Sequence, residues 1–372
     1  MTKAEIFNIP DKRPRVLVAP LDWGLGHATR CVPIISKLLQ QNCSVIVAAE
    51  GAGKILLQKE FPSLEFIELA GYRMHYSRNR FWMPATLLLQ FPKLLFRIFA
   101  ERRWLKKIVA THKIDAVISD NRPGLSHTKI PCIYITHQLS IKTGNAFLER
   151  SAQKIHYHFI NKYSACWVPD AGGAINLTGD LGHPLVLPKT PVTYLGPLSR
   201  FEKKASAIKY DLCILISGPE PQRTVFEKMI LEELKGISAN IILLRGLPAE
   251  TNIDIANTAS FEIYNHLPAE ELTAVLLQSK MVICRSGYTT IMDLIKLQKK
   301  AILVPTPGQT EQEYLAQYLR QQQLFYAVRQ ENFSAAVIKE ADAFAFTESS
   351  MLLNSYEKII EDLVKELVKQ NQ

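Results

Sequence analysis

The segment LDWGLGHATR, residues 21–30, joins two glycines to a histidine. Gly24 and Gly26 allow the backbone to approach a ligand closely, and a helix that begins after such a turn offers unpaired amides to an anionic group. His27 could take a proton from an alcohol or a water molecule near neutral pH, which would make the oxygen a nucleophile. The alternative is a structural role, in which His27 caps or hydrogen-bonds the loop.

The same turn partly matches a dinucleotide-binding fingerprint. Glu50 follows the second predicted strand, where that fingerprint has an acid that binds a ribose. However, Thr29 stands at the third glycine position, and simple pyrophosphate binding has no use for a histidine. The turn alone therefore does not establish a dinucleotide site.

A second group of polar residues lies within residues 282–319. A predicted strand ends at Ser286 and Gly287 ahead of a helix, so the amides of this turn and the Ser286 hydroxyl could hold a phosphate. Asp293, about two turns into that helix, could accept hydrogen bonds from a ribose diol. Residues that could bind a polyhydroxylated ring follow on the next helix: Glu311, Gln312 and Glu313. Such residues ordinarily form a solvated face, but their common position at the carboxyl ends of strands favours a binding site.

Strand-like runs alternate with helix-like stretches on both sides of a linker, residues 196–210, which predicts two parallel sheets. The runs before the linker are RVLVAP, CSVIVAA, LEFIEL, DAVISD, PCIYIT and ACWVPD, and those after it are LCILIS, NIILLR, FEIYNH, MVICRS and AILVPT. We expect one domain over residues 1–198, a second over 199–346, and a terminal helix over 347–372 that crosses back to the first domain.

Charge and cysteine content restrict the function classes. Residues 1–198 carry a net charge of +12 and residues 199–372 one of −3, so the first half is expected to meet an anionic surface or ligand. Six cysteines are scattered without a C-x-x-C pair, which indicates reduced core residues of a cytosolic protein. The amino terminus has no apolar signal core, and no segment offers the roughly 18 apolar residues of a membrane span.

Residues 78–107 break the alternating pattern. They carry eight Lys and Arg against one Glu, together with six aromatic residues: Phe81, Trp82, Phe91, Phe96, Phe99 and Trp104. A long helix packed on the core with a basic outer face is one interpretation. Docking onto an anionic membrane surface is the other, because the apolar residues cover more than one helix face.

Two of these segments resemble the donor-binding half of the MurG-like glycosyltransferases: CRSGYTTIMD, residues 284–293, and LVPTPGQTEQEYLAQ, residues 303–317. GLGHATR and YLGPLSR are similar to the amino-terminal loop and the interdomain linker of that superfamily. The resemblance spans nearly the whole chain, and the part from Cys284 to Gln312 is the most specific. It implies the α/β GT-B fold, with two facing Rossmann-like domains that bind the acceptor and the nucleotide-sugar, respectively.

Residue by residue, the resemblance makes His27 the base, Ser286 and Gly287 the diphosphate contact, Asp293 the ribose-binding acid and Gln312 a contact of a sugar hydroxyl. Further donor-binding candidates are Ser217, Gly218, Arg223, His266, Leu267, Arg285, Tyr288, Thr289 and Glu311. Candidates for the acceptor side or its loops are Gly24, Gly26, Asp120, His137 and Gln138.

The sequence also departs from the family pattern. Pro219 and Pro221 lack the amide protons that a phosphate-binding turn would use, and we expect Arg223 to compensate as a phosphate contact. Asp293 replaces the usual Glu, and Glu313 replaces a second Gln, so these positions bear on the identity of the donor sugar.

The prediction is a metal-independent glycosyltransferase of the hexosyltransferase type that uses a UDP-linked sugar. No Asp-x-Asp occurs, and helix amides and arginine would stabilise the leaving diphosphate instead of a cation. We expect a lipid-linked acceptor, a peripheral position on the inner face of the membrane through residues 78–107, and no nucleic-acid partner. Two alternatives remain: a nucleotide-sugar hydrolase, in which His27 activates water beside Arg30, and a non-catalytic nucleotide-binding protein.

Overall fold

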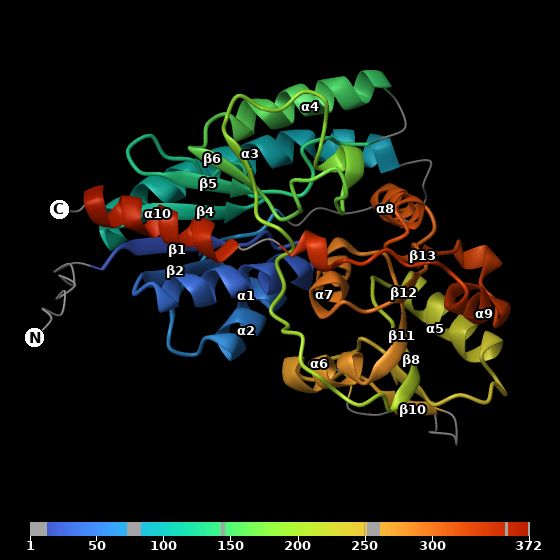
Figure 1. Ribbon diagram of the computed structural model, residues 1–372. Helices are drawn as coiled ribbons and strands as arrows, with labels where there is room; N and C mark the ends of the chain where they lie inside the picture. Colours follow the sequence, from blue (N-terminus) through green and yellow to red (C-terminus); the bar gives the residue numbers. More distant parts are fainter. Residues whose placement is uncertain are drawn as a thin grey trace, which may run out of the picture.

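The computed structural model describes residues 13–72, 83–142, 146–248, 250, 261–353 and 356–370. Two α/β domains lie side by side, each built on a parallel sheet (Figure 1). The first sheet has the order β3-β2-β1-β4-β5-β6-β7. Its strands are β1 (Arg15–Ala19), β2 (Ser44–Ala49), β3 (Glu65–Glu68), β4 (Ala116–Asp120), β5 (Cys132–Ile135), β6 (Ala165–Val168) and β7 (Val192–Tyr194).

The second sheet has the order β10-β9-β8-β11-β12-β13. Its strands are β8 (Tyr210–Leu215), β9 (Ile241–Leu244), β10 (Phe261–Tyr264), β11 (Ser279–Cys284), β12 (Ala301–Leu303) and β13 (Tyr326–Ala327). The prediction of two parallel-sheet α/β domains with the GT-B fold is confirmed. The short strands β7 and β13 were not predicted, because three and two residues are too few to give a hydrophobic pattern.

Helices cover both faces of each sheet (Figure 1). In the first domain, α1 and α2 lie on one face, and α3 and α4 on the other. The helices are α1 (Leu25–Gln40), α2 (Gly51–Glu60), α3 (Met83–His112), α4 (Ala146–Ile160), α5 (Gln222–Glu233), α6 (Ala269–Leu277), α7 (Tyr288–Leu297), α8 (Thr310–Gln321), α9 (Ala336–Asp342) and α10 (Tyr356–Gln370). The inner strands of each sheet, such as β4 and β5, are buried on both sides, which explains their continuous apolar runs. The edge strands β3 and β7 are only partly buried.

In each sheet, the chain adds strands first on one side of the first strand and then on its other side. The chain runs from β1 to β2 on one side, and β4 then pairs with the free edge of β1. In the same way, β11 pairs with β8 after β9 has paired on its other edge. Ligands of open α/β sheets bind at such points, outside the carboxyl ends of the strands. The start of α1 therefore lies beside the end of β4, and the start of α7 beside the loop that follows β8.

The chain passes from the first sheet to the second between Tyr194 and Tyr210, and the expected boundary at residue 198 falls within this segment. After the second domain, α10 packs against α1 of the first (Figure 1). Its residues Ile360, Val364 and Leu367 are buried. Lys37 of α1 also forms an ion pair of 2.6 Å with Glu361. The terminal helix thus ties the two domains together.

Residues 78–82 of the predicted aromatic and basic segment lie outside the described residues, and the rest belongs to α3. Phe96 and Phe99 are 70% and 58% exposed, but Trp104 is partly buried against the core beside Leu105. Trp104 therefore does not belong to an exposed docking face. Within the described segments, no helix has the length and apolar character needed to cross a membrane. All six cysteines are buried and free, as expected of reduced core residues.

Candidate active site

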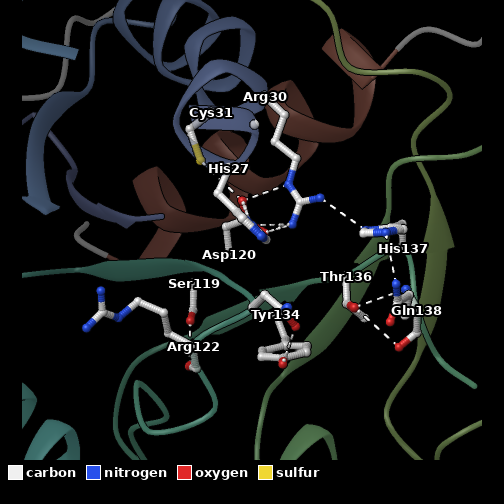
Figure 2. A network of polar contacts seen from close by, with 12 residues as sticks. His27, Arg30, Cys31, Ser119, Asp120, Arg122, Tyr134, Thr136, His137 and Gln138 are labelled. Carbon is white, nitrogen blue, oxygen red and sulfur yellow. Dashed lines mark hydrogen bonds and ion pairs between the residues drawn. The ribbon is translucent and has the colours of Figure 1, made fainter. Parts of the chain in front are cut away.

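His27 lies in the first turn of α1, directly after the glycine turn. Gly24 precedes the helix with φ of 73°, a conformation that favours glycine. The turn directs His27 toward the end of β4, where its Nδ1 lies 3.1 Å from Oδ2 of Asp120 (Figure 2). The Asp120 side chain is fully buried, whereas that of His27 is 13% exposed. An imidazole that is held by a carboxylate on one nitrogen and is not fully buried is the arrangement of a general base.

Arg30 occupies the next turn of α1 and binds both oxygens of Asp120. Its Nε donates to Oδ2 over 2.7 Å, and its Nη2 donates to Oδ1. Burial alone would raise the pKa of Asp120, but Arg30 and His27 outweigh it and lower that pKa to about 2. Burial and the Arg30 charge lower the pKa of His27, while Asp120 acts in the opposite direction. The site therefore combines an ionised Asp120 with a His27 that is readily kept unprotonated.

The His27 cluster extends to His137, which follows β5 (Figure 2). Nδ1 of His137 lies 3.1 Å from Nη1 of Arg30, and Nε2 lies 2.9 Å from Oε1 of Glu311 on α8 of the second domain. The His137 ring stacks on Tyr288, with 4.2 Å between ring centroids. Gln138 contacts His137 over 3.4 Å through its amide nitrogen. His137 and Gln138 therefore lie where the two domains meet.

The domains also approach each other closely at the starts of α1 and α7. A Cβ atom at Gly26 would lie 2.5 Å from the hydroxyl of Thr289, so this position has no room for a side chain. The Tyr288 hydroxyl donates to the carbonyl of Pro169 in the first domain. Tyr288 and Thr289, predicted as donor-binding residues, thus contact the first domain.

The start of α7 is open at Gly287, where an added Cβ would meet nothing within 4 Å. Ser286 is different, because it is fully buried and its hydroxyl donates to the Gln312 carbonyl over 2.8 Å. Its hydroxyl braces α8 and does not face a ligand. In this arrangement a phosphate at this turn would meet backbone amides, and the role of the Ser286 hydroxyl as a phosphate contact stays a prediction.

Arg285 is also a structural group. Its guanidinium donates to the carbonyls of Val304 and Pro305, each over 3.1 Å, and lies over the ring of Phe226. Burial lowers its pKa to about 10. Nη1 of Arg285 therefore holds the loop after β12, whereas its buried Nε has no hydrogen-bond partner among the described residues.

Arg223, the expected phosphate contact, is paired with groups inside the second domain. It is 5% exposed, and it donates to Glu220 over 2.6 Å and to Glu227 over 3.1 Å. Its Nη1 donates to the carbonyl of Arg245. The neighbouring Ser217 and Gly218 are exposed, and Gly218 has φ of 105° with open space around it. Those two residues, and not Arg223, are available to a ligand.

Asp293 accepts a hydrogen bond of 2.5 Å from the hydroxyl of Ser199 in the linker. Burial raises the pKa of Asp293 to about 7, although Ser199 and Arg200 favour the charged form. Sequence reasoning missed Ser199, even though it lies in the YLGPLSR segment. The shorter Asp at this position thus contacts the linker between the domains.

The remaining donor-side candidates fall into two groups. His266 is exposed after β10, whereas the Leu267 side chain is buried in the core. On α8, Oε1 of Gln312 accepts from the amide of Thr306 over 2.9 Å, so this oxygen holds the loop after β12. Glu313 accepts from the amide of Gly308 in the same loop. Among the predicted α8 contacts, Glu311 reaches across to the first domain. Within the described residues, no group of three or more His, Cys, Asp or Glu could hold a metal ion.

Residues 222–368 match the glycosyltransferase family 28 C-terminal domain. In sequence and in fold, the chain is similar to the MurG-like GT-B glycosyltransferases. Those relatives are enzymes that transfer sugars, and the placement of the GLGHATR turn opposite the start of α7 agrees with that similarity.

Two relatives are UDP-N-acetylglucosamine--N-acetylmuramyl-(pentapeptide) pyrophosphoryl-undecaprenol N-acetylglucosamine transferases. The Haemophilus ducreyi protein is 28% identical over 175 residues, which span 46% of this chain and 45% of that protein, less than half its length. The Glaesserella parasuis protein is 22% identical over 328 residues, or 85% of each chain.

Solved structures share the fold. MurG of Acinetobacter baumannii has a TM-score of 0.54 at 16% identity and covers 95% of this chain and 100% of its own. Arabidopsis thaliana UGT89C1 complexed with UDP-L-rhamnose has a TM-score of 0.65 at 13% identity and covers 96% and 99%, respectively.

Replacing Arg223 distinguishes a structural role from phosphate binding. Arg223→Gln leaves the buried Glu227 without one of its two cations, so the free energy of unfolding in urea should fall by about 3 kcal/mol. The KM for the sugar donor should stay within about threefold of wild type. Arg329→Gln, which alters an ion pair at an exposed arginine, is the matched control. A raised donor KM at unchanged stability would instead assign Arg223 to the diphosphate.

Asp293 should make stability depend on pH. Its pKa is about 7 in the folded protein and about 3.9 in the unfolded chain, so folding favours the protonated acid. Its contribution is greatest at low pH and is lost as the pH rises through about 7. Asp293→Asn is uncharged at every pH. Its melting temperature should therefore rise relative to that of wild type as the pH increases from 5 to 8. An equal difference at all pH values would show that Asp293 titrates normally.

Proposed function

We propose that this chain transfers a sugar from a UDP-linked donor to an acceptor hydroxyl, with His27 as the base. The observation that carries the proposal is the pairing of His27, in the first turn of α1, with the buried Asp120. This pair lies beside the second-domain residues Tyr288 and Glu311, through His137. A base at the boundary of the two domains can reach an acceptor held by one domain and a donor held by the other.

The proposed reaction needs one proton transfer and one substitution. Nε2 of His27 takes the proton of the acceptor hydroxyl as its oxygen attacks the anomeric carbon of the donor sugar. The bond from that carbon to the diphosphate oxygen breaks, and the nucleoside diphosphate leaves with the electron pair. Asp120 accepts a hydrogen bond from Nδ1 and stabilises the imidazolium that forms. We expect an inverting outcome.

The donor would lie against the carboxyl ends of β8, β11 and β12. Open backbone at Gly218 and Gly287 and the amides at the start of α7 would hold the diphosphate without a metal ion. Asp293 would exchange its bond to Ser199 for a ribose hydroxyl, and Glu311 and Gln312 would bind the sugar. The UDP named for the Haemophilus ducreyi relative and for the UGT89C1 complex supports this choice of nucleotide.

We further propose a lipid-linked acceptor and peripheral docking on the inner face of an anionic membrane. The relatives named above act on a pyrophosphoryl-undecaprenol acceptor. The exposed Phe96 and Phe99 of α3 lie among basic residues, namely Lys93, Arg97, Arg103, Lys106 and Lys107. A second apolar stretch, Leu185 to Leu187, is also exposed on the first domain. Aromatic and basic side chains together favour an anionic lipid surface.

Loss of the base should abolish most turnover. We expect His27→Ala to lower kcat by about 10²- to 10⁴-fold, because a positioned base contributes that much. His158→Gln changes an exposed histidine of α4 and should match wild type. The assay incubates a panel of UDP- and GDP-sugars with protein and EDTA, with and without membrane extract, and measures nucleoside diphosphate and free sugar separately.

The products of this assay separate the alternatives. Nucleoside diphosphate released only with extract, without free sugar, is expected of the transferase. Free sugar in equal amount without extract would make the chain a hydrolase. Full turnover by His27→Ala would remove the base assignment, and binding of UDP-sugars with no product would indicate a non-catalytic protein.

Membrane docking is tested by co-sedimentation with vesicles. Wild type should bind anionic vesicles and not neutral ones, and Phe96→Ser with Phe99→Ser should weaken binding about tenfold by removing two exposed aromatic rings. Trp104 is left unchanged because it packs on the core. Ile208→Ser, which changes an apolar residue 58% exposed in the linker, is the control. Failure of wild type to bind at low salt would rule out the docking proposal.

A further inference from the structure

The first turns of α1 and α7 contact each other across the boundary between the domains (Figure 1). A Cβ atom added at Gly26 of α1 would lie 2.5 Å from Oγ1 and 3.4 Å from Cβ of Thr289 on α7. Apart from neighbouring residues of α1, no other atom of the described residues lies within 4 Å of that position. Thr289 is therefore the group that fills the space beside Gly26.

The backbone of α1 does not itself require a glycine at residue 26. Gly26 lies within the helix and, unlike Gly24, is not in the left-handed region. Alanine is more favourable than glycine inside a helix, because glycine loses more conformational freedom on folding. The local structure thus favours a side chain at this position, and the contact with the second domain excludes one.

The first turn of α7 has little freedom to move aside. Thr289 carries two heavy atoms on Cβ, so a rotation that removes Oγ1 brings the methyl group into the same space in most staggered positions. The preceding residue, Tyr288, stacks on His137 and donates its hydroxyl to the carbonyl of Pro169, both in the first domain. A methyl group at residue 26 would therefore have to push the two helices apart.

The contact joins the two parts of the proposed site. Gly26 directly precedes His27, the proposed base, and Thr289 lies two residues after Gly287, where the backbone is open to the diphosphate. The base and the donor are then held by different domains, so their separation decides whether the acceptor oxygen can reach the anomeric carbon. A misplacement of about 1 Å can lower the rate about 100-fold.

We propose that Thr289 is a positioning residue whose volume, packed against Gly26, sets the distance between the His27 turn and the donor-binding turn of the second domain. Its role is that of a spacer, and its hydroxyl is not needed as a ligand of the donor. The catalytic consequence rests on the proposed function. The distance between the domains is a property of the protein and can be measured without substrate.

The test begins with Gly26→Ala in the full chain. Its kcat should fall about 100-fold, while the dissociation constant of UDP, measured by titration calorimetry, should stay within about threefold of wild type. The two readouts differ because the second domain alone would bind the nucleotide. Gly173→Ala is the matched control, because a Cβ atom there would meet only the carbonyl oxygen of Ile175, at 3.7 Å.

A second substitution separates spacing from a general disturbance. In Gly26→Ala with Thr289→Ala, the atom nearest to the new methyl group is the Cβ atom of residue 289, at 3.4 Å, which is ordinary van der Waals contact. The kcat of this double variant should recover to within about fivefold of wild type, since the two positions are coupled.

Enlarging the contact from the other side keeps the test decisive if Gly26→Ala does not fold. Thr289→Ile adds a methyl group toward α1 and should lower kcat about 100-fold. Thr289→Val, the conservative variant, keeps the branched shape without the hydroxyl and should recover most of that loss.

Hydrogen exchange measures the separation without substrate. The Asp180 amide of the first domain donates to the Tyr314 hydroxyl of α8 over 2.7 Å, so it reports contact between the domains. Its exchange should be faster in Gly26→Ala and should return to the wild-type rate when Thr289→Ala is added.

A wild-type kcat in Gly26→Ala, or no recovery in the double variant, would overturn the spacer role. So would a loss in Thr289→Val as large as in Thr289→Ile, which would assign a role to the hydroxyl. Absence of sugar transfer by wild type would overturn the proposed function alone. The exchange rates would then decide, and equal Asp180 exchange in wild type and Gly26→Ala would overturn the spacer role.

Discussion

The buried carboxylate of Asp120 is the constraint on which the site depends. An ionised group without solvent is costly unless it is paired and hydrogen-bonded, so Asp120 requires a cation inside the fold. Arg30 supplies that cation from α1, and His27 lies three residues earlier on the same helix face. Both reach Asp120 because β1 and β4 are neighbouring strands. The order of β1 and β4 and the start of α1 thus bring the arginine and the histidine to Asp120 together.

The second domain completes this arrangement at its contact with the first. Gly26 allows α7 to come within reach of α1, and His137 stacks on Tyr288. The loop after β12 is held from inside by Nη1 of Arg285, which donates to the carbonyls of Val304 and Pro305. Open backbone remains at Gly287 and Gly218. Because the polar side chains at these loops are bonded to other protein groups, the backbone amides are the groups available to an anion.

The sequence predicted the architecture because long apolar runs alternate with helical ones. It indicated His27 as a candidate because this histidine follows a glycine turn between a predicted strand and a helix, where ligands of open α/β sheets bind. It could not predict which way polar side chains turn. Ser286 and Arg285 stand at a strand end, as a donor site requires, yet their partners come from the loop after β12 and from α8. Arg223 likewise donates hydrogen bonds to Glu227 and to the carbonyl of Arg245. The spacing of these residues in the sequence does not predict that they meet. Asp120 was predicted as a residue of the acceptor side or its loops, but its pairing with Arg30 could not be predicted, because it depends on the strand order.

The basic excess of the first domain divides into two parts with different roles. Arg30 and Arg122 are buried and neutralised by Asp120 and Glu101, so they contribute nothing to attraction at a distance. The lysines and arginines on the outer face of α3 are exposed and carry the charge that an anionic surface would meet. The two parts are joined, because Arg122 donates to Glu101 of α3 over 2.8 Å and follows Asp120 by two residues. It also donates to the carbonyl of Pro20, just after β1. The basic helix is therefore fixed to the same strand ends that hold the proposed base.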